Sequence, residues 1–183
     1  MEKFKNKYRI PSSRADWWNY SSSGFYFITI CTYNKENLFG KIRDGVVELS
    51  QLGLIVKLEW EKSFLIRNEL FCDEYVIMPN HIHAVVEIRK NPSDNDKINN
   101  FIVETHGRAS LPRRTPKSIS SFIAGFKSSA TRRINTFRNK PKERVWQSRF
   151  YDHIILNERE YLNIKNYILD NPSNWEMDKL CVD

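Results

Sequence analysis

The stretch ELFCDEYVIMPNHIHAVVEIR, residues 69–89, decides the fold. It holds two runs rich in β-branched and aromatic residues, 69–79 and 82–89, a composition typical of strands. Between the runs, the dipeptide Pro79-Asn80 is a turn signal. We therefore predict two neighbouring antiparallel strands joined by a short connection.

Three further strands are expected. Residues 24–33 (GFYFITICTY) and 145–155 (VWQSRFYDHII) are β-branched and aromatic, and residues 44–50 (DGVVELS) form a shorter run behind a turn. Helices are predicted between these strands. Four or five strands with intervening helices indicate the α+β class, with an antiparallel sheet covered by helices on one face.

The predicted helices have recognisable starts. A first helix covers residues 50–64, with Ser50 as N-cap. A second begins at Thr115, which is expected to cap it, with Pro116 in the first helical position. The last helix, about 158–171, follows the capping pattern of Asn157 with Glu160 three residues later, and it must end before Pro172.

Length and composition exclude several classes of protein. A chain of 183 residues with 40% hydrophobic residues is expected to form a single domain over residues 1–183. No run approaches the roughly 18 apolar residues of a membrane span, and no apolar segment of a signal peptide follows the charged N-terminus. Three widely spaced cysteines without a CxxC motif indicate a reducing compartment. We therefore expect a cytoplasmic, nucleoid-associated protein with no membrane partner.

The positive charge is concentrated in residues 107–144. This segment holds eleven Lys or Arg and one acid, which leaves 18 basic and 21 acidic residues of the total 29 and 22 elsewhere. Such a basic loop and helix is typical of a polyanion-binding surface. We predict that it contacts DNA through these side chains: Arg108, Arg113, Arg114, Lys117, Lys127, Arg132 and Arg133.

Two of the four histidines, His81 and His83, are separated by one residue at the start of a predicted strand. Alternate side chains of a strand share a face, so both imidazoles point the same way and can bind one divalent ion. A structural role for the pair stays open at this point. The spacing excludes a histidine-triad hydrolase, because Val85 occupies the next position on that face, and an HExxH zinc protease is excluded because the motif is absent.

The last helix supplies a candidate nucleophile. On a helical wheel, Tyr161 belongs to an apolar stripe with Leu162, Ile164, Ile168 and Leu169 that is expected to be buried. Tyr167 falls on the flank of this stripe, one turn before Asn171. A tyrosine beside a metal ion can act in phosphoryl transfer, although a boundary tyrosine is the commoner case.

Together, these features resemble the single-tyrosine HUH transposases, which include the REP-associated tyrosine transposases of bacteria. His81-Ile82-His83, preceded by MPN, resembles the family's histidine–hydrophobic–histidine motif. A second block, WQSRFYDHII…EYLNIKNYILDNP, from residue 146 to 172, resembles the family's tyrosine helix with the elements before it. The resemblance covers roughly residues 9–175.

The resemblance implies a ferredoxin-like α+β fold with the histidines on a central strand. It implies a transposase-like endonuclease and strand transferase, in which Tyr167 attacks a phosphate of single-stranded DNA to give a 5′-phosphotyrosine. His81, His83 and Asn171 match the positions that bind the metal, which would be Mg²⁺ or Mn²⁺. The substrate would be a DNA hairpin or palindromic repeat end, and both a monomer and a homodimer are compatible with the family.

Two other functions stay open on the sequence. One is an HUH nickase of the replication-initiator type, which has the same order of motifs but usually carries a further domain. Relaxases are less similar, since their tyrosine precedes the histidines. The other is a domesticated protein that binds nucleic acid on the same fold without catalysis, and a nicking assay on hairpin-bearing single strands would separate it from an enzyme.

Overall fold

A computed structural model of the chain describes residues 3–4, 7–8, 18–89, 115–178 and 180–181. Its centre is a four-stranded antiparallel sheet in the order β6-β7-β3-β8. The strands are β3 (Gly24–Cys31), β6 (Leu70–Ile77), β7 (His81–Ile88) and β8 (Tyr151–Ile155). The expected α+β class is confirmed, and β7, which carries both histidines, is an inner strand.

The β6–β7 hairpin forms as residues 69–89 predict. Its register runs from Ile77 opposite Ile82 to Leu70 opposite Ile88, with one irregularity between Cys72 and Glu74. Asp73 is the extra residue at this β-bulge. A bulge re-aims the side chain of its extra residue, and that of Asp73 accepts a hydrogen bond from the hydroxyl of Tyr161 at 2.7 Å.

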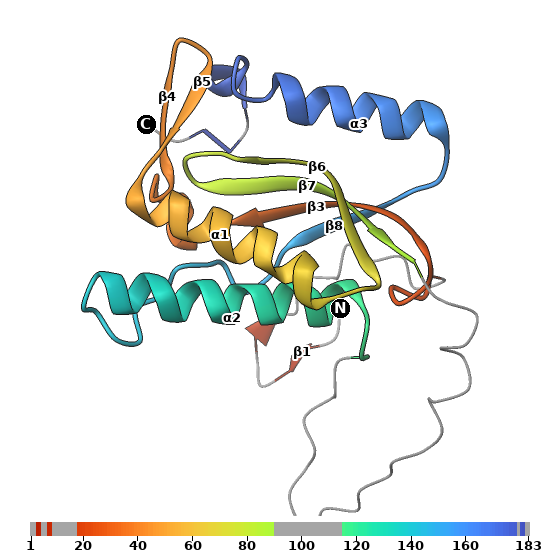
Figure 1. Cartoon of the computed structure of the whole chain (residues 1–183), viewed down its shortest axis with the longest axis horizontal. Coiled ribbons are helices and arrows are strands. Elements are labelled where there is room, and N and C mark those ends of the chain that lie inside the picture. Colours follow the sequence, from red (N-terminus) through yellow and green to blue (C-terminus); the bar gives the residue numbers. More distant parts are fainter. Residues whose placement is uncertain (1–2, 5–6, 9–17, 90–114, 179, 182–183) are drawn as a thin grey trace, which may run out of the picture.

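Three α-helices cover the sheet on both faces (Figure 1). Helices α1 (Gln51–Ile66) and α2 (Ile119–Phe137) lie on one face, and α3 (Glu158–Asp170) lies on the other. The expectation that all helices share one face is therefore wrong. The reason lies in β7, whose alternating residues are buried on both sides, and a sheet buried on both faces needs a helix layer on each.

The larger core lies between the sheet and α1 with α2. It includes Ile28 and Ile30 of β3, Val86 of β7 and Trp60 of α1, all fully buried. A smaller cluster under α3 joins Val85, Ile155 and Ile168. The two faces thus differ in size and composition, and the smaller cluster leaves room for polar residues beside it.

The helix starts were predicted with mixed success. Ser50 caps α1 by accepting from Gly53 N at 3.1 Å, and Asn157 caps α3 by accepting from Glu160 N at 2.9 Å, as expected. The start of α2 was placed wrongly at Thr115. Its N-cap is Ser118, because Lys117 has a positive φ of 53° that breaks the helical path.

Smaller elements complete the described chain. A second hairpin pairs β4 (Gly40–Arg43) with β5 (Val46–Leu49) through Asp44-Gly45, which both have positive φ as a tight hairpin turn requires. Two short strands, β1 (Lys3–Phe4) and β2 (Lys7–Tyr8), pair near the N-terminus, and two 3₁₀ turns cover Tyr33–Lys35 and Trp175–Met177. The strand expected over residues 145–155 is shorter, because only Tyr151–Ile155 pairs along β3.

No helix among the described residues combines the length and the apolar character needed to cross a bilayer.

Candidate metal and tyrosine site

Both histidines of the motif lie on the face of β7 that α3 covers. Their partners on β3 are Cys31 for His81 and Thr29 for His83. The two side chains are 0% and 3% exposed, and their ring centroids are 4.4 Å apart. The prediction that the two imidazoles share one face is confirmed.

The ring of His83 is fixed on three sides. Its Nδ1 lies 2.8 Å from the hydroxyl oxygen of Thr29, and its Nε2 lies 3.2 Å from the hydroxyl oxygen of Tyr167. The ring of Phe27 stacks on it at a centroid distance of 5.3 Å. One imidazole edge therefore faces the tyrosine of α3 directly.

The protonation of His81 follows from its neighbour Asn80. The amide nitrogen of Asn80 donates to the carbonyls of Lys35, at 3.2 Å, and Leu180, at 2.8 Å. The amide oxygen of Asn80 is thus the atom that lies 2.8 Å from Nδ1 of His81, and it accepts a hydrogen bond from the Nδ1–H group. This leaves the Nε2 lone pair available as a ligand, the usual way in which a hydrogen bond selects a metal-binding tautomer.

A carboxylate that the sequence did not point to completes the cluster. Oδ2 of Asp178 lies 3.9 Å from Nε2 of His81, and the ligand atoms of His81, His83 and Asp178 all lie within 4.8 Å of one another. Asp178 is held by the backbone N–H of Leu180 at 2.7 Å and by the side-chain amide of Asn171 at 2.9 Å.

The charges of these groups follow from burial and hydrogen bonding. Burial lowers the pKa of His83 to about 3, with a further contribution from the neighbouring His81, and burial also lowers the pKa of His81. Burial alone would raise the pKa of Asp178, but hydrogen bonds from Leu180 and Asn171 bring it below its usual value. Near pH 7 the set is therefore two neutral imidazoles and one carboxylate.

This donor set fits a divalent cation. Two buried polar atoms, Nε2 of His81 and the amide oxygen of Asn171, have no hydrogen-bond partner among the described residues. Leaving buried polar atoms unpaired costs about 1–3 kcal/mol each, a cost that a bound ion would offset. Imidazole and carboxylate ligands suit Mn²⁺ and related divalent ions.

Tyr167 joins the site from α3. It is 45% exposed and borders a cavity of about 600 Å³ together with His83, Asp178 and Tyr151. Burial of part of the ring, the charge of Asp178 and a hydrogen bond to it raise the pKa of Tyr167, against a lowering effect of Asn171. The hydroxyl is thus protonated near neutral pH and is open to a ligand in the cavity.

The other tyrosine of α3, Tyr161, lies outside the site. Tyr161 packs against Phe25 at a centroid distance of 5.3 Å, and its hydroxyl donates to Asp73, away from the histidines. Two leucines of the predicted stripe, Leu162 and Leu169, are 48% and 55% exposed, so their expected burial is wrong. A helix lying on a flat sheet buries a narrower strip than the wheel assumes, here Ile164 and Ile168 beside Tyr161.

Asn171 is 3% exposed and ends α3 as its C-cap. Its amide nitrogen faces Asp178, and its oxygen is one of the unpaired buried atoms. The structure therefore places Asn171 beside the cluster, and its role as a ligand stays a prediction.

The structure describes four of the seven predicted DNA-contacting cations, and these four have different surroundings. Arg108, Arg113 and Arg114 lie outside the described residues. Arg133 pairs with Glu59 of α1 at 2.6 Å and so joins two helices. The ammonium of Lys127 donates to the carbonyls of Gln147 at 2.8 Å and Arg149 at 2.9 Å.

Three of the described predicted cations are exposed, and Arg133 is one of them despite its ion pair. Lys117 is exposed in the turn before α2, and Arg132 is exposed on the second half of that helix. At about 1.5 Å per residue, the helix between Ile119 and Arg132 separates them by about 20 Å.

Three residues of the site carried no assignment from sequence. Asn80 had a signal that could have been used, since it is a polar residue directly before the motif in an otherwise apolar run. Thr29 lies in β3, and its place beside His83 follows from the pairing of β3 with β7, which the sequence does not show. Asp178 comes after the turn Trp175–Met177, so no helical or strand period relates it to Tyr167.

Comparisons with known proteins find relatives of this chain and a solved structure of similar fold. No family model matches the chain. An uncharacterized protein of Haemophilus influenzae is 38% identical over 182 residues, covering 94% of this chain and 93% of that protein. A second H. influenzae protein, provisionally assigned as a REP-associated tyrosine transposase, is 29% identical over 97 residues, covering 52% of this chain and 46% of that protein.

Among solved structures, a REP-associated tyrosine transposase bound to a REP hairpin has a TM-score of 0.58 at 17% identity. The match covers 91% of this chain and 77% of that chain. The resemblance to single-tyrosine HUH transposases that the sequence indicated is confirmed. The chain belongs to one family with the uncharacterized H. influenzae protein, and its fold is that of a REP-associated tyrosine transposase.

Proposed function

We propose that the protein is an HUH transposase that cleaves and rejoins single-stranded DNA through Tyr167. The observation that carries the proposal is the hydroxyl of Tyr167 lying 3.2 Å from Nε2 of His83, beside the cluster of His81, His83 and Asp178. A phenol and a candidate divalent-ion site thus face the same cavity, as phosphoryl transfer by a tyrosine requires.

The metal would be held by His81, His83 and Asp178, with Asn171 orienting the carboxylate or adding its oxygen. Bound there, Mg²⁺ or Mn²⁺ would act as a Lewis acid on the phosphate. Asn80 and Thr29 fix the two rings through their Nδ1 atoms. These second partners hold the ligand geometry before the ion arrives.

The chemical step uses Tyr167 as nucleophile. Its oxygen attacks the scissile phosphorus, the bond from phosphorus to the 3′ oxygen breaks, and a 5′-phosphotyrosine forms. The phenol proton leaves to water and the 3′ oxygen gains a proton, so charge is balanced. Attack of a 3′-hydroxyl on the phosphotyrosine reverses the step and joins strands. The raised pKa of Tyr167 means that the phenol carries this proton near neutral pH before a metal ion binds.

The DNA substrate is proposed to be a single strand carrying a hairpin. Support comes from the fold shared with a transposase whose structure holds a REP hairpin, and from the concentration of positive charge in residues 107–144. Paired palindromic repeats in the DNA that flanks the gene would identify the sequence of the hairpin.

The test is formation of a covalent protein–DNA adduct. Labelled hairpin-bearing strands from the flanking DNA are incubated with Mn²⁺ and wild-type protein, and the adduct is resolved under denaturing conditions. We expect an adduct with wild type and with Tyr161→Phe, and none with Tyr167→Phe. Tyr161→Phe is the matched control, because it removes one hydroxyl from the same helix. Absence of any adduct with wild type, while binding persists, would support the non-catalytic binder instead.

A further inference from the structure

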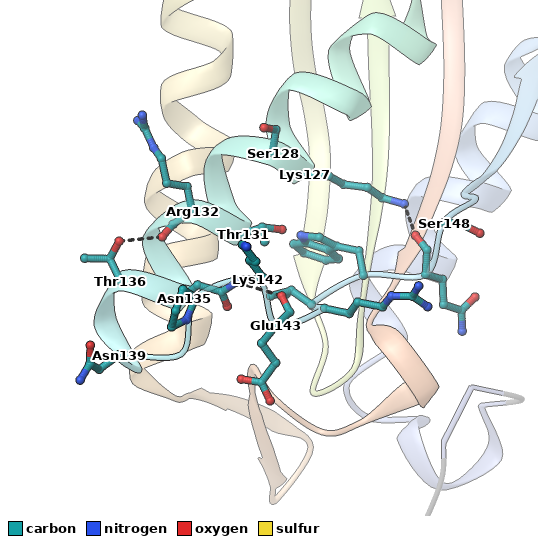
Figure 2. Close-up of a pocket in the computed structure, with 15 residues that line it drawn as sticks. Lys127, Ser128, Thr131, Arg132, Asn135, Thr136, Asn139, Lys142, Glu143 and Ser148 are labelled. Atoms are coloured by element: carbon teal, nitrogen blue, oxygen red, sulfur yellow. Dashed lines mark hydrogen bonds between the residues drawn. The ribbon is translucent and has the colours of Figure 1, made fainter. Parts of the chain in front are cut away.

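A second cavity lies outside the catalytic one, between α2 and the segment of residues 139–148 that returns along it (Figure 2). We call it the basic groove. Its volume of about 880 Å³ is larger than the roughly 600 Å³ of the cavity beside Tyr167. This size lies in the range of about 300–1,000 Å³ typical of ligand sites.

The groove is positively charged. Arg132 stands at its rim, and Lys142 and Arg144 come from the returning segment. Within the described part of the chain, none of these three pairs with a carboxylate. The one acid of the lining, Glu143, pairs with Arg138 at 3.2 Å and with Lys140 at 3.9 Å, and neither of these two cations lines the groove. The guanidinium of Arg144 lies over the ring of Tyr33 at 5.4 Å, so it too has no carboxylate partner in the described part of the chain, and the lining keeps a net positive charge.

The groove is adjacent to the catalytic cavity. Gln147 lines both, Ser148 lines the groove, and Arg149 lines the catalytic cavity. Two residues of chain span at most about 7 Å, so a thin wall separates the two sites. A polymer leaving the catalytic cavity can cross this wall and enter the groove within a short length.

The wall between them is held rigidly. Lys127 donates to the carbonyls of Gln147 and Arg149, at 2.8 and 2.9 Å. On its other edge, Gln147 N donates to the carbonyl of Cys31 at 3.0 Å, and Trp146 forms a bridge with Thr32. These hydrogen bonds fix the position of the groove relative to the catalytic cavity.

The side chains that line the groove suit the sugar-phosphate backbone of DNA better than its bases. Its one aromatic residue, Trp146, is only 8% exposed and is packed between Phe39 and Phe126 at centroid distances of 5.1 and 5.5 Å. No stacking platform for bases is therefore offered by the groove lining, whereas cations and small polar side chains bind phosphates.

We propose that the basic groove holds the sugar-phosphate backbone of the unpaired DNA strand that continues from the scissile phosphate. This proposal rests on the proposed function, because it takes the occupant of the catalytic cavity to be single-stranded DNA. It adds a second binding site with a sequence-independent role.

The experiment measures binding of a 20-nucleotide oligo-dT strand by fluorescence anisotropy across a salt series, with EDTA present. The variant Arg132→Ala/Lys142→Ala/Arg144→Ala removes three cations on the surface of the groove. Each lost phosphate contact lowers the slope of log K against log salt by about 0.7, so the slope should become shallower by about 2. A mixed-sequence strand should lose affinity by the same factor.

The matched control, Lys41→Ala/Lys57→Ala/Lys62→Ala, removes the same charge from residues that line neither cavity. It should keep the wild-type slope. A blunt hairpin without an unpaired flank should bind wild type and the groove variant equally.

Three results would overturn the inference while leaving Tyr167 chemistry intact. These are an unchanged slope in the groove variant, an equal loss in the control, and an equal loss for the blunt hairpin. A loss confined to one base composition would overturn the backbone assignment. Failure of wild type to bind any single strand would overturn the proposed function together with this inference.

Discussion

The two faces of the central sheet follow different rules. On the face toward α1 and α2, the residues of β7 are Ile82, Ala84, Val86 and Ile88, all 0% exposed and packed in the main core. On the face toward α3, the same strand carries His81 and His83, and only Val85 joins an apolar cluster. One strand thus supplies stability on one side and chemistry on the other. Helix α3 therefore packs on a smaller apolar cluster than α1 and α2, because polar side chains take up part of the sheet face beneath it.

The largest effect on stability should separate alanine variants of two adjacent residues of β7, Ile82 and His83, whose side chains lie on opposite faces of the sheet. Ile82→Ala removes a fully buried side chain from the main core and should lower the free energy of unfolding by about 2–5 kcal/mol. His83→Ala should cost less than half as much, because His83 borders the cavity and water can fill the space. Urea unfolding of both variants measures the difference. Equal costs would show that the two faces are not specialised.

Metal affinity should separate Asp178 from Asn171. Calorimetric titration with Mn²⁺ measures the affinity of each variant. We expect Asp178→Asn to bind Mn²⁺ at least tenfold more weakly than Asn171→Ala, because the carboxylate carries the charge and Asn171 only donates a hydrogen bond to it at 2.9 Å. Loss of a group that only orients a ligand typically costs about 10–100-fold. The reverse order of losses would make Asn171 the ligand, as its place in the family motif implies.

The pH dependence of stability should report on Lys127, which joins α2 to the wall of the catalytic cavity. Burial lowers the pKa of Lys127 to about 8 from 10.5. Between these values the unfolded chain binds more protons than the folded one, so folding is stabilised as pH rises. Relative to Lys127→Met, the wild type should gain on the order of 2 kcal/mol between pH 7.5 and about 10.5. Parallel unfolding curves for both proteins over this range would contradict the buried position of the ammonium.

A smaller effect is expected at the start of α2. Ser118 accepts from Ser121 N at 3.2 Å, so Ser118→Ala should cost about 1 kcal/mol of stability. Thr115→Ala should be nearly neutral, since its side chain does not cap the helix. Thermal unfolding distinguishes the two, and a larger loss at Thr115 would return the cap to the residue that the sequence suggested.

Much of the fold could be predicted because its signals are local. Runs of β-branched and aromatic residues around the Pro79-Asn80 turn marked β6 and β7, and Ser50 and Asn157 marked helix starts, since a cap acts within three residues. Local signals failed where the sequence fits two different placements of an element equally well. Thr115 and Ser118 are both good caps, and only the positive φ of Lys117 decides between them. Leu162 and Leu169 fit an apolar stripe, but the width of the buried strip depends on the sheet that α3 meets.

The candidate site was predictable in part for the same reason. His81 and His83 lie two apart on one strand, so their shared face follows from geometry. Tyr167 was indicated by the resemblance and by its place on the helix flank. Asp178 could not be found, because the chain turns twice after Asn171 before its carboxylate returns to His81. Contacts of this kind are set by tertiary packing.

The measurement that tests the central claim most directly is the location of the phosphotyrosine. The adduct formed by wild-type protein with a labelled hairpin strand and Mn²⁺ is digested with protease, and the DNA-linked peptide is sequenced by mass spectrometry. We expect a single modified residue, Tyr167, on the face of the sheet that carries His81 and His83. Modification of Tyr151, which borders the same cavity, or of any other residue would contradict it.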